Sequence, residues 1–328
     1  MKKALRITGY LLAVVIAAVA AGYIYLQYAF PNVDAAPVLS IEKTPALVER
    51  GKYLANHVAV CIDCHSTRDF SRYSGPLQPG TEGKGGDRFD HSLGFPGTFY
   101  ARNITSDKET GIGAWTDGEV YRAMTKGVSK NGEPLFPVMP YKAYSQMKTE
   151  DAYAVIAYIR TLAPIRNEVP ASDPDFPMNL ILRTMPSDEA PMLEQTALED
   201  EVTKGKYLLT ISSCGDCHTP RDKGNPIEEM HLAGGSEFPT PDGGKLRSAN
   251  ITPDRETGIG NWTAEVFVQR FKSQEHPAAV APGGPNTIMP WSMYAGMKEE
   301  DLRAIYSYLM TVKPINNKIE RFTPPAKS

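Results

Sequence analysis

Cysteine is scarce in this chain, which has four in 328 residues. None lies near the N-terminus, so a lipoprotein anchor is excluded. All four fall in two pentapeptides of the pattern C-x-x-C-H, at residues 61–65 and 214–218. Disulfides within these pentapeptides would leave both adjacent histidines unexplained. A zinc site at each would need a fourth ligand, and neither a spare cysteine nor a repeated histidine supplies one.

The chain also lacks an excess of positive charge. Its 35 basic and 38 acidic residues give a formal net charge of −3. The first 30 residues contain three cations and no acid, so the rest has 32 basic against 38 acidic residues and a net charge of −6. This mildly acidic body has no basic stripe for nucleic acid or for anionic lipid. We therefore expect no nucleic-acid partner.

The C-x-x-C-H spacing is the attachment signature of c-type haem. Two thiols three residues apart reach the two vinyl groups along one side of a porphyrin, and the next residue places an imidazole on the iron. The sequence therefore predicts two covalently bound haem c groups. The attachment cysteines and proximal histidines are Cys61, Cys64 and His65 for the first group and Cys214, Cys217 and His218 for the second.

The chain repeats itself once. Five short blocks recur in the same order: G-K-Y-L, C-x-x-C-H, N-I-T-x-D, T-G-I-G-x-W and M-P. Such ordered self-similarity indicates one folded unit used twice. We place the first repeat at residues 43–168 and the second repeat at residues 197–318.

Between the repeats, residues 169–196 are rich in proline and acids, which predicts a linker. The linker also contains an apolar stretch, and two interpretations of it stay open. It packs in the groove between the two units, or it docks a partner subunit. Its apolar residues are Met178, Leu180, Ile181, Leu182 and Met185. Residues 319–328 contain two prolines and are expected to form an unstructured tail.

No alternating strand pattern is convincing, and the apolar spacing within each repeat is helical. Threonine at N-cap positions and proline after the last apolar residue mark helix ends. The predicted helices cover residues 44–57, 116–127 and 149–162 in the first repeat and residues 263–271 and 298–311 in the second. We therefore expect an all-α fold with two tandem domains.

An uncharged stretch from residue 7 to residue 30 is long enough to cross a membrane as a helix. Lys2, Lys3 and Arg6 precede it and should stay in the cytoplasm, which places the rest of the chain outside. We expect a single-pass bacterial inner-membrane protein with a lipid-embedded anchor at residues 1–30, a tether at residues 31–42 and periplasmic haem domains. The alternative is a cleaved signal peptide.

The M-P block nominates Met139 and Met289 as the distal iron ligands. A methionine thioether there gives a six-coordinate centre with no vacant position. Met147 and Met297 are also a repeated pair, but their helical spacing is typical of core filling. Two saturated haems indicate electron transfer rather than oxygen chemistry, so no catalytic residue is assigned.

Two further repeated pairs suit the propionate edges of the haems, because an amide or indole N–H can hydrogen-bond a carboxylate. These residues are Asn103, Trp115, Asn250 and Trp262. The alternative for them is ordinary turn chemistry and core aromatics. His57, His91 and His276 are alternative axial ligands, but none has a histidine counterpart in the other repeat.

The repeated blocks resemble the membrane-anchored diheme and triheme cytochrome c subunits of bacterial periplasmic alcohol and gluconate dehydrogenases. The resemblance covers about residues 43–318. It implies small helical cytochrome c domains, and it implies the same cysteine, histidine and methionine assignments. The best-known relatives carry three haem modules and often a C-terminal membrane helix, whereas this chain has two modules and an N-terminal anchor.

The resulting hypothesis is a non-catalytic electron-transfer subunit of an oxidoreductase complex. It would carry electrons from a periplasmic dehydrogenase to the respiratory chain. Alternative functions are a cytochrome c subunit of a terminal oxidase or quinol-oxidising complex, and a diheme peroxidase-like enzyme. A peroxidase needs one open haem, and a methionine in both M-P loops argues against it.

Overall fold

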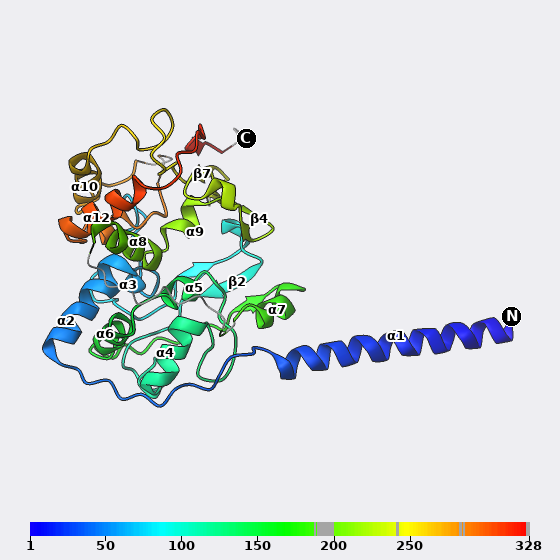
Figure 1. The fold of residues 1–328 in the computed structure, drawn as a ribbon. Helices are drawn as coiled ribbons and strands as arrows, with labels where there is room; N and C mark the ends of the chain where they lie inside the picture. Colours follow the sequence, from blue (N-terminus) through cyan, green and yellow to red (C-terminus); the bar gives the residue numbers. More distant parts are fainter. Residues whose placement is uncertain (187, 189–199, 241–242, 282–283, 285, 326–328) are drawn as a thin grey trace.

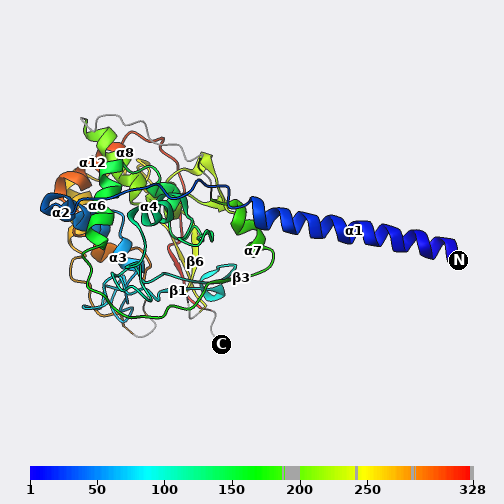
Figure 2. The same cartoon turned by 90° about the horizontal axis from the view of Figure 1, so that it is seen from below.

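A computed structural model describes residues 1–186, 188, 200–240, 243–281, 284 and 286–325. Helix α1 (Lys2–Ala29) projects away from a rounded body that contains the rest of the described chain (Figures 1 and 2). It has no buried residue, and it is the single described helix that is long and apolar enough to cross a membrane. The predicted apolar span is therefore a helix that projects free of the body.

The segment after α1 lies on the body instead of forming a free tether. The Ile41 amide donates to an Asp117 carboxylate oxygen at 3.0 Å. A Cβ on Gly118 would lie 1.7 Å from the Pro37 carbonyl oxygen, so only glycine lets this segment approach so closely. The end of α1 is also held, because Arg183 donates to the Phe30 carbonyl at 2.8 Å.

Arg183 belongs to the apolar stretch of the predicted linker. Its short helices are α7 (Met178–Ile181) and η3 (Leu182–Thr184), and η3 contacts α1. The described part of the stretch therefore lies beside the C-terminal end of α1, as Figure 1 shows for α7. The remaining linker residues, 187 and 189–196, lie outside the described residues.

Helices of the first repeat form close to where the sequence predicts them. The N-caps have the expected chemistry: Thr44 accepts from the Leu47 amide, and Thr116 forms a capping box with Glu119. Gly127 ends its helix in the left-handed conformation, at φ 70°. The helical elements are α2 (Pro45–Tyr53), the π-helical turn η1 (Leu54–Val58), α3 (Cys61–Cys64), η2 (His91–Leu93), α4 (Asp117–Lys126), α5 (Tyr141–Tyr144) and α6 (Thr149–Ile159).

The second repeat has the same order of helices. Asp200 and Thr263 cap its longer helices by accepting from the amides of Thr203 and Val266. Its helical elements are α8 (Glu201–Ile211), α9 (Cys214–His218), η4 (Glu228–Met230), α10 (Ala264–Lys272), α11 (Trp291–Tyr294) and α12 (Glu299–Leu309).

One glycine in each repeat explains the close packing of its helices. Helix α2 packs on α6, and α8 packs on α12. A Cβ on Gly51 would lie 1.8 Å from the Ala154 carbonyl oxygen, and one on Gly205 would lie 1.8 Å from the Ala304 carbonyl oxygen. The glycine of the G-K-Y-L block is thus required where two backbones touch.

The expectation of an all-α fold holds only in part, because the largely helical body also contains three small antiparallel sheets. Their strands are too short to show an alternating pattern in the sequence. The strands are β1 (Arg88–Phe89), β2 (Gly97–Tyr100) and β3 (Asp173–Pro174) in one sheet, β4 (Arg221–Asp222) and β5 (Asn225–Pro226) in another, and β6 (Glu237–Pro239), β7 (Lys245–Arg247) and β8 (Phe322–Thr323) in the third.

Strand β8 corrects the prediction of an unstructured tail. It pairs with β7, with Leu246 opposite Phe322. Residues 319–325 therefore join the body of the second repeat, and residues 326–328 lie outside the described residues.

The two repeats meet through reciprocal contacts. The Tyr53 hydroxyl of the first repeat bonds the Asp301 carboxylate of the second, and the Tyr207 hydroxyl of the second bonds the Asp151 carboxylate of the first at 2.6 Å. Each residue of one pair is the sequence equivalent of a residue in the other. Such an exchange of equivalent contacts is the signature of a two-fold interface.

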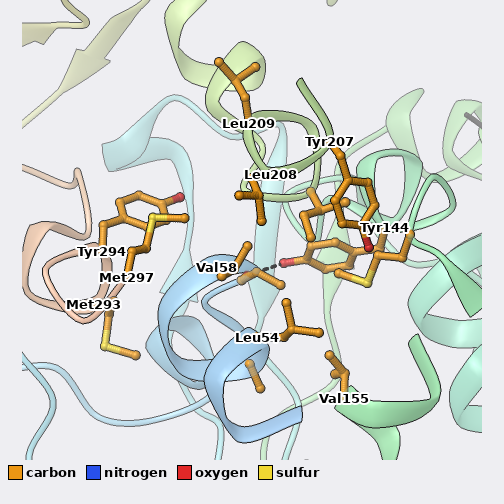
Figure 3. Packing of buried hydrophobic residues seen from close by; sticks show 14 of the residues in the cluster. Leu54, Val58, Tyr144, Val155, Tyr207, Leu208, Leu209, Met293, Tyr294 and Met297 are labelled. Atoms are coloured by element: carbon orange, nitrogen blue, oxygen red, sulfur yellow. Dashed lines mark hydrogen bonds between the residues drawn. The ribbon is translucent and has the colours of Figure 1, made fainter. Parts of the chain in front are cut away.

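Each of these carboxylates also pairs with a cation of its own repeat. Arg50 binds Asp151 with two contacts of 2.8 Å, and Lys204 contacts Asp301 at 2.5 Å. Around them one continuous apolar core contains residues of both repeats. Figure 3 shows this core, with Leu54, Val58 and Tyr144 from the first repeat packed near Leu208 and Tyr294 from the second.

Candidate haem sites

Both C-x-x-C-H pentapeptides lie on short helices, α3 and α9, that begin in the same unusual way. The residue before the first cysteine is left-handed in each: Val60 has φ 47° and Ser213 has φ 55°. A left-handed non-glycine residue costs about 1–2 kcal/mol. Strain of this kind persists where the surrounding structure holds it, and functional sites are common among such places.

The two histidines of the pentapeptides are oriented identically. His65 Nδ1 is 2.6 Å from the Arg102 carbonyl oxygen, and His218 Nδ1 is 2.8 Å from the Ala249 carbonyl oxygen. A carbonyl can only accept, so each Nδ1 carries the proton and donates it. The other ring nitrogen, Nε2, then keeps its lone pair for a metal.

Desolvation favours the neutral form of both imidazoles. Desolvation lowers the pKa of His65 and of His218 below the usual range, against the opposing effect of the carbonyl that each contacts. The neutral ring is the ligating species. The donor set therefore fits a haem iron in both repeats.

The four cysteines are not poised as reactive thiolates. Burial raises the pKa of Cys61, Cys64 and Cys214 to about 12 and that of Cys217 to about 11. Redox-active C-x-x-C motifs instead have lowered thiol pKa values. In the described part of the chain no cluster of three or more His, Cys, Asp or Glu side chains is placed to hold a metal ion.

The contact of Asn103 and Asn250 with propionates stays a prediction, and in the structure both side-chain amides hydrogen-bond within the protein. The Asn103 amide donates to Thr110 Oγ1 at 3.1 Å and to the Ile165 carbonyl at 2.8 Å. Asn250 makes the equivalent bonds to Thr257 Oγ1 and the Ile315 carbonyl, at 3.0 and 2.7 Å. Both N–H bonds of each amide are therefore used inside the protein.

These amides fix the loop whose carbonyl orients the histidine of each pentapeptide. Asn103 follows Arg102 directly, and Asn250 follows Ala249, so each amide anchors the residue next to the carbonyl that His65 or His218 contacts. The N-I-T-x-D block is therefore a support for the histidine. Sequence reasoning recognised its repetition but not this role.

The two tryptophans stay as predicted propionate contacts. Trp115 and Trp262 are partly buried against the core. Their carbonyls are used, since Trp115 O accepts from Arg160 at 2.6 Å and Trp262 O accepts from Tyr306 at 2.7 Å. Among the described residues no partner is seen for either indole N–H.

The structure separates the two repeated methionine pairs. Met139 and Met289 lie in loops directly before α5 and α11, where they are partly buried against the same core as Cys61 and Cys214. Met147 and Met297 lie deep in that core, at 8% and 1% exposure. This arrangement matches the expectation of core filling for the second pair.

Two of the alternative histidines already have partners. His57 Nδ1 lies 2.9 Å from the Met293 carbonyl, which joins the first repeat to α11 of the second. His91 pairs with Asp175 at 2.7 Å near the surface. His276 is exposed.

Two tyrosines that support the sites were not among the predicted site residues. The Tyr144 hydroxyl donates to the Ala59 carbonyl at 2.7 Å, and the Tyr294 hydroxyl donates to the Ser212 carbonyl at 2.8 Å. Each accepting carbonyl lies two residues before the first cysteine of its repeat. These buried bonds join the helix after the M-P block to the start of the haem motif, and the repeated tyrosines were visible in the sequence.

Comparison with known proteins finds a family match for the second repeat. Residues 202–313 match the cytochrome c family model. Residues 202–313 form a cytochrome c domain. A cytochrome c domain binds haem c covalently, and this haem supplies a one-electron redox centre.

Relatives extend the similarity over most of the chain. The cytochrome c subunit of gluconate 2-dehydrogenase from Pantoea cypripedii is 30% identical over 280 residues, which is 81% of this chain and 60% of the relative. The cytochrome c subunit of the quinone alcohol dehydrogenase from Gluconobacter oxydans is 29% identical over 284 residues, 82% of this chain and 55% of the relative.

A relative of more similar length is the diheme cytochrome c-type protein of Cereibacter sphaeroides. It is 29% identical over 265 residues, which is 78% of this chain and 82% of the relative. The chain spans only 60% of the gluconate dehydrogenase subunit and 55% of the alcohol dehydrogenase subunit. The similarity to cytochrome c subunits of dehydrogenases agrees with the resemblance seen in the repeated blocks.

Proposed function

We propose that the chain is a membrane-anchored diheme cytochrome c that carries electrons from a periplasmic dehydrogenase to the respiratory chain. The observation that carries this proposal is the matched orientation of His65 and His218. Each donates its Nδ1 proton to a backbone carbonyl and keeps Nε2 for iron. The second repeat matches the cytochrome c model, and the first repeat orients its histidine in the same way. This likeness supports the assignment of the first repeat as a cytochrome c domain too.

In this proposal residues 43–168 and 197–318 are tandem cytochrome c domains with one haem c each. Cys61 and Cys64 hold the first haem, and Cys214 and Cys217 hold the second. A carbonyl that accepts from an imidazole Nδ1 fixes the ring and strengthens it as a ligand. The buried hydrogen bonds of Tyr144 and Tyr294 hold the helix after each M-P block, α5 or α11, against the start of the haem motif.

Met139 and Met289 complete the coordination on the distal side. Their partial burial against the core supports this assignment. A thioether ligand raises the reduction potential and leaves no vacant position on the iron. The two centres are therefore suited to passing single electrons. We expect that carbon monoxide binds neither haem rapidly, and rapid binding to one would favour a peroxidase-like enzyme.

Helix α1 supports the location. Residues 1–30 act as an uncleaved inner-membrane anchor, with Lys2, Lys3 and Arg6 on the cytoplasmic side and the haem domains in the periplasm. The bond from Arg183 to the last carbonyls of α1 ties the body to the helix. A segment removed by a signal peptidase has no need of such a bond.

The experiment for the partner is purification of the full chain from native membranes in mild detergent, followed by mass spectrometry of the proteins that accompany it. A dehydrogenase present in equal amount supports the proposal and identifies the oxidised substrate class. Oxidase or quinol-oxidising subunits in its place would contradict the proposed donor.

A further inference from the structure

The loops that present the two methionines are supported from different places. In the first repeat the Met139 loop is held locally. Phe136 stacks on Phe99 of β2, with ring centroids 4.0 Å apart, and Phe95 packs edge-on against Phe136. Within the described residues, no side chain of the second repeat hydrogen-bonds to the backbone of Met139 or of Tyr141.

In the second repeat the Met289 loop is held by a residue of the first repeat. The Ser74 hydroxyl donates to the Met289 carbonyl at 2.7 Å and accepts from the Trp291 amide at 2.8 Å. Ser74 is completely buried. One hydroxyl therefore closes the turn on both sides of Pro290.

The backbone around Ser74 is fixed to the same loop by further bonds. The Ser74 amide donates to Asn286 Oδ1 at 2.8 Å, and Asn286 Nδ2 donates to the Phe70 carbonyl at 2.9 Å. The Tyr73 amide donates to the Ala278 carbonyl at 2.9 Å. Ser74 is thus placed by a network, and its φ of 68° is maintained by that network.

More bonds join the same two segments nearby. The Val280 amide donates to the Ser71 carbonyl at 2.9 Å, and Arg72 donates to the Pro277 carbonyl at 2.7 Å. Residues 70–74, which follow the first haem motif, are therefore hydrogen-bonded to residues 277–280, 286 and 289–291 of the second repeat. The loop that contains Met289 is thus held by the segment that follows the first haem motif.

We propose that Ser74 is a positioning residue for Met289, so that the first repeat controls the distal ligand of the second haem. The inference rests on the proposed function, because it requires Met289 to bind iron. A thioether is a weak ligand, and the turn that presents it stays in place only if its carbonyl and the following amide are held. Both repeats have the turn's own bond, from Tyr141 N to Met139 O and from Trp291 N to Met289 O, and Ser74 adds a hydroxyl only to the second.

The test uses the full chain in detergent with the substitutions Ser74→Ala and Ser74→Gly. Glycine removes the hydroxyl and also accepts the positive φ, so it guards against loss of folding. Ser71→Ala is the matched control, because its hydroxyl donates at 2.6 Å to Asp69 within the same loop. Met139→Ala and Met289→Ala identify the two halves of the visible charge-transfer band that reports sulfur on ferric iron.

We expect both Ser74 variants to lose the Met289 half of this band at a lower temperature than the wild type, while the Met139 half stays unchanged. The reduction potential of the second haem falls as its sulfur is lost. Independently of haem, the Trp291 amide exchanges its hydrogen about tenfold faster, since it loses one acceptor. Ser71→Ala changes none of these.

Two results have separate meanings. If Met289→Ala leaves the band intact, Met289 is not a ligand and the proposed coordination is wrong. If Met289→Ala removes half of the band but both Ser74 variants keep it with wild-type thermal stability and potential, the positioning role is overturned.

Discussion

The same arginine lies three residues after the proximal histidine in both repeats, but its surroundings differ. Arg68 is buried between Asp63 and Asp87, at 3.1 and 2.7 Å, with its side chain 9% exposed. Arg221 pairs with Asp216 at 2.6 Å, with its side chain 41% exposed. The orientation of His65 and His218 is shared, whereas the charge environment of each C-x-x-C-H motif is specific to its repeat.

Burial raises the pKa of Asp216, and Arg221 opposes that rise, but the effect is larger at the buried position of the first motif. Burial raises the pKa of Asp63 to about 6, and the Arg68 guanidinium opposes this rise. Asp63 also has a buried carboxylate oxygen, Oδ1, for which no partner is found in the described residues. The first haem motif therefore depends on Arg68 in a way that the second does not depend on Arg221.

The largest expected effect comes from replacing the arginine that follows each motif. Arg68→Ala leaves two buried carboxylates without their cation, and we expect a loss of about 3–5 kcal/mol in the free energy of unfolding. Arg221→Ala breaks a half-exposed pair and should cost about 0–1 kcal/mol. Urea denaturation of both variants measures the contrast, and equal losses would show that the two motifs are supported alike.

A feature that the repeats share should respond equally in both. Gly51→Ala and Gly205→Ala each force a methyl group against a carbonyl 1.8 Å away, so we expect losses of about 1–3 kcal/mol from either. Gly215→Ala is the control, because the nearest atom to its Cβ would be 3.9 Å away. Thermal denaturation should show a clear decrease for the first two and none for the third.

The interface between the repeats predicts a smaller, symmetric effect. Tyr53→Phe and Tyr207→Phe each remove one hydroxyl from a buried carboxylate of the opposite repeat, which should cost about 1–2 kcal/mol. The double variant tests independence in urea denaturation. A loss much smaller than the two single losses together would mean that the two contacts form one cooperative unit.

The smallest effect concerns acid stability. Hydrogen bonds from Thr110 lower the pKa of Asp107, and those from Thr257 lower the pKa of Asp254. A lowered folded-state pKa stabilises the protein above the unfolded value of about 4, and the benefit disappears as the pH falls further. Asp107→Asn and Asp254→Asn should therefore flatten the decrease in melting temperature below about pH 4.

Thermal melts at a series of acidic pH values measure this slope. Glu119→Gln is not a suitable control, because Glu119 closes a capping box. Asp222→Asn is suitable, since Asp222 is exposed and lies outside these loops. An unchanged slope in both loop variants would contradict the assigned hydrogen bonds.

The sequence repeats predicted the helices and the haem motifs because these depend on local spacing. Capping threonines, helical periodicity and C-x-x-C-H are all visible within a few residues. The role of Asn103 was not predictable, because its partner Ile165 lies 62 residues away. A short block shows that a residue is repeated, but it does not show which carbonyl the side chain reaches.

Contacts between the repeats were even harder to predict from the sequence. Ser74 reaches Met289 across 215 residues, and it has no repeated counterpart to draw attention to it. Strand β8 was missed for a similar reason, since it pairs with β7 only when the chain's end folds back on the second repeat. Repetition is thus informative about what each unit does alone, and silent about how the units meet.

The central claim is that each repeat carries one covalently bound haem. The most direct test is the intact mass of the full chain, compared with the Cys61→Ser/Cys64→Ser and Cys214→Ser/Cys217→Ser double variants. The account predicts a wild-type mass equal to the polypeptide plus two haems, and one haem in each variant. A wild-type chain with a single haem, or with free thiols at either motif, would contradict it.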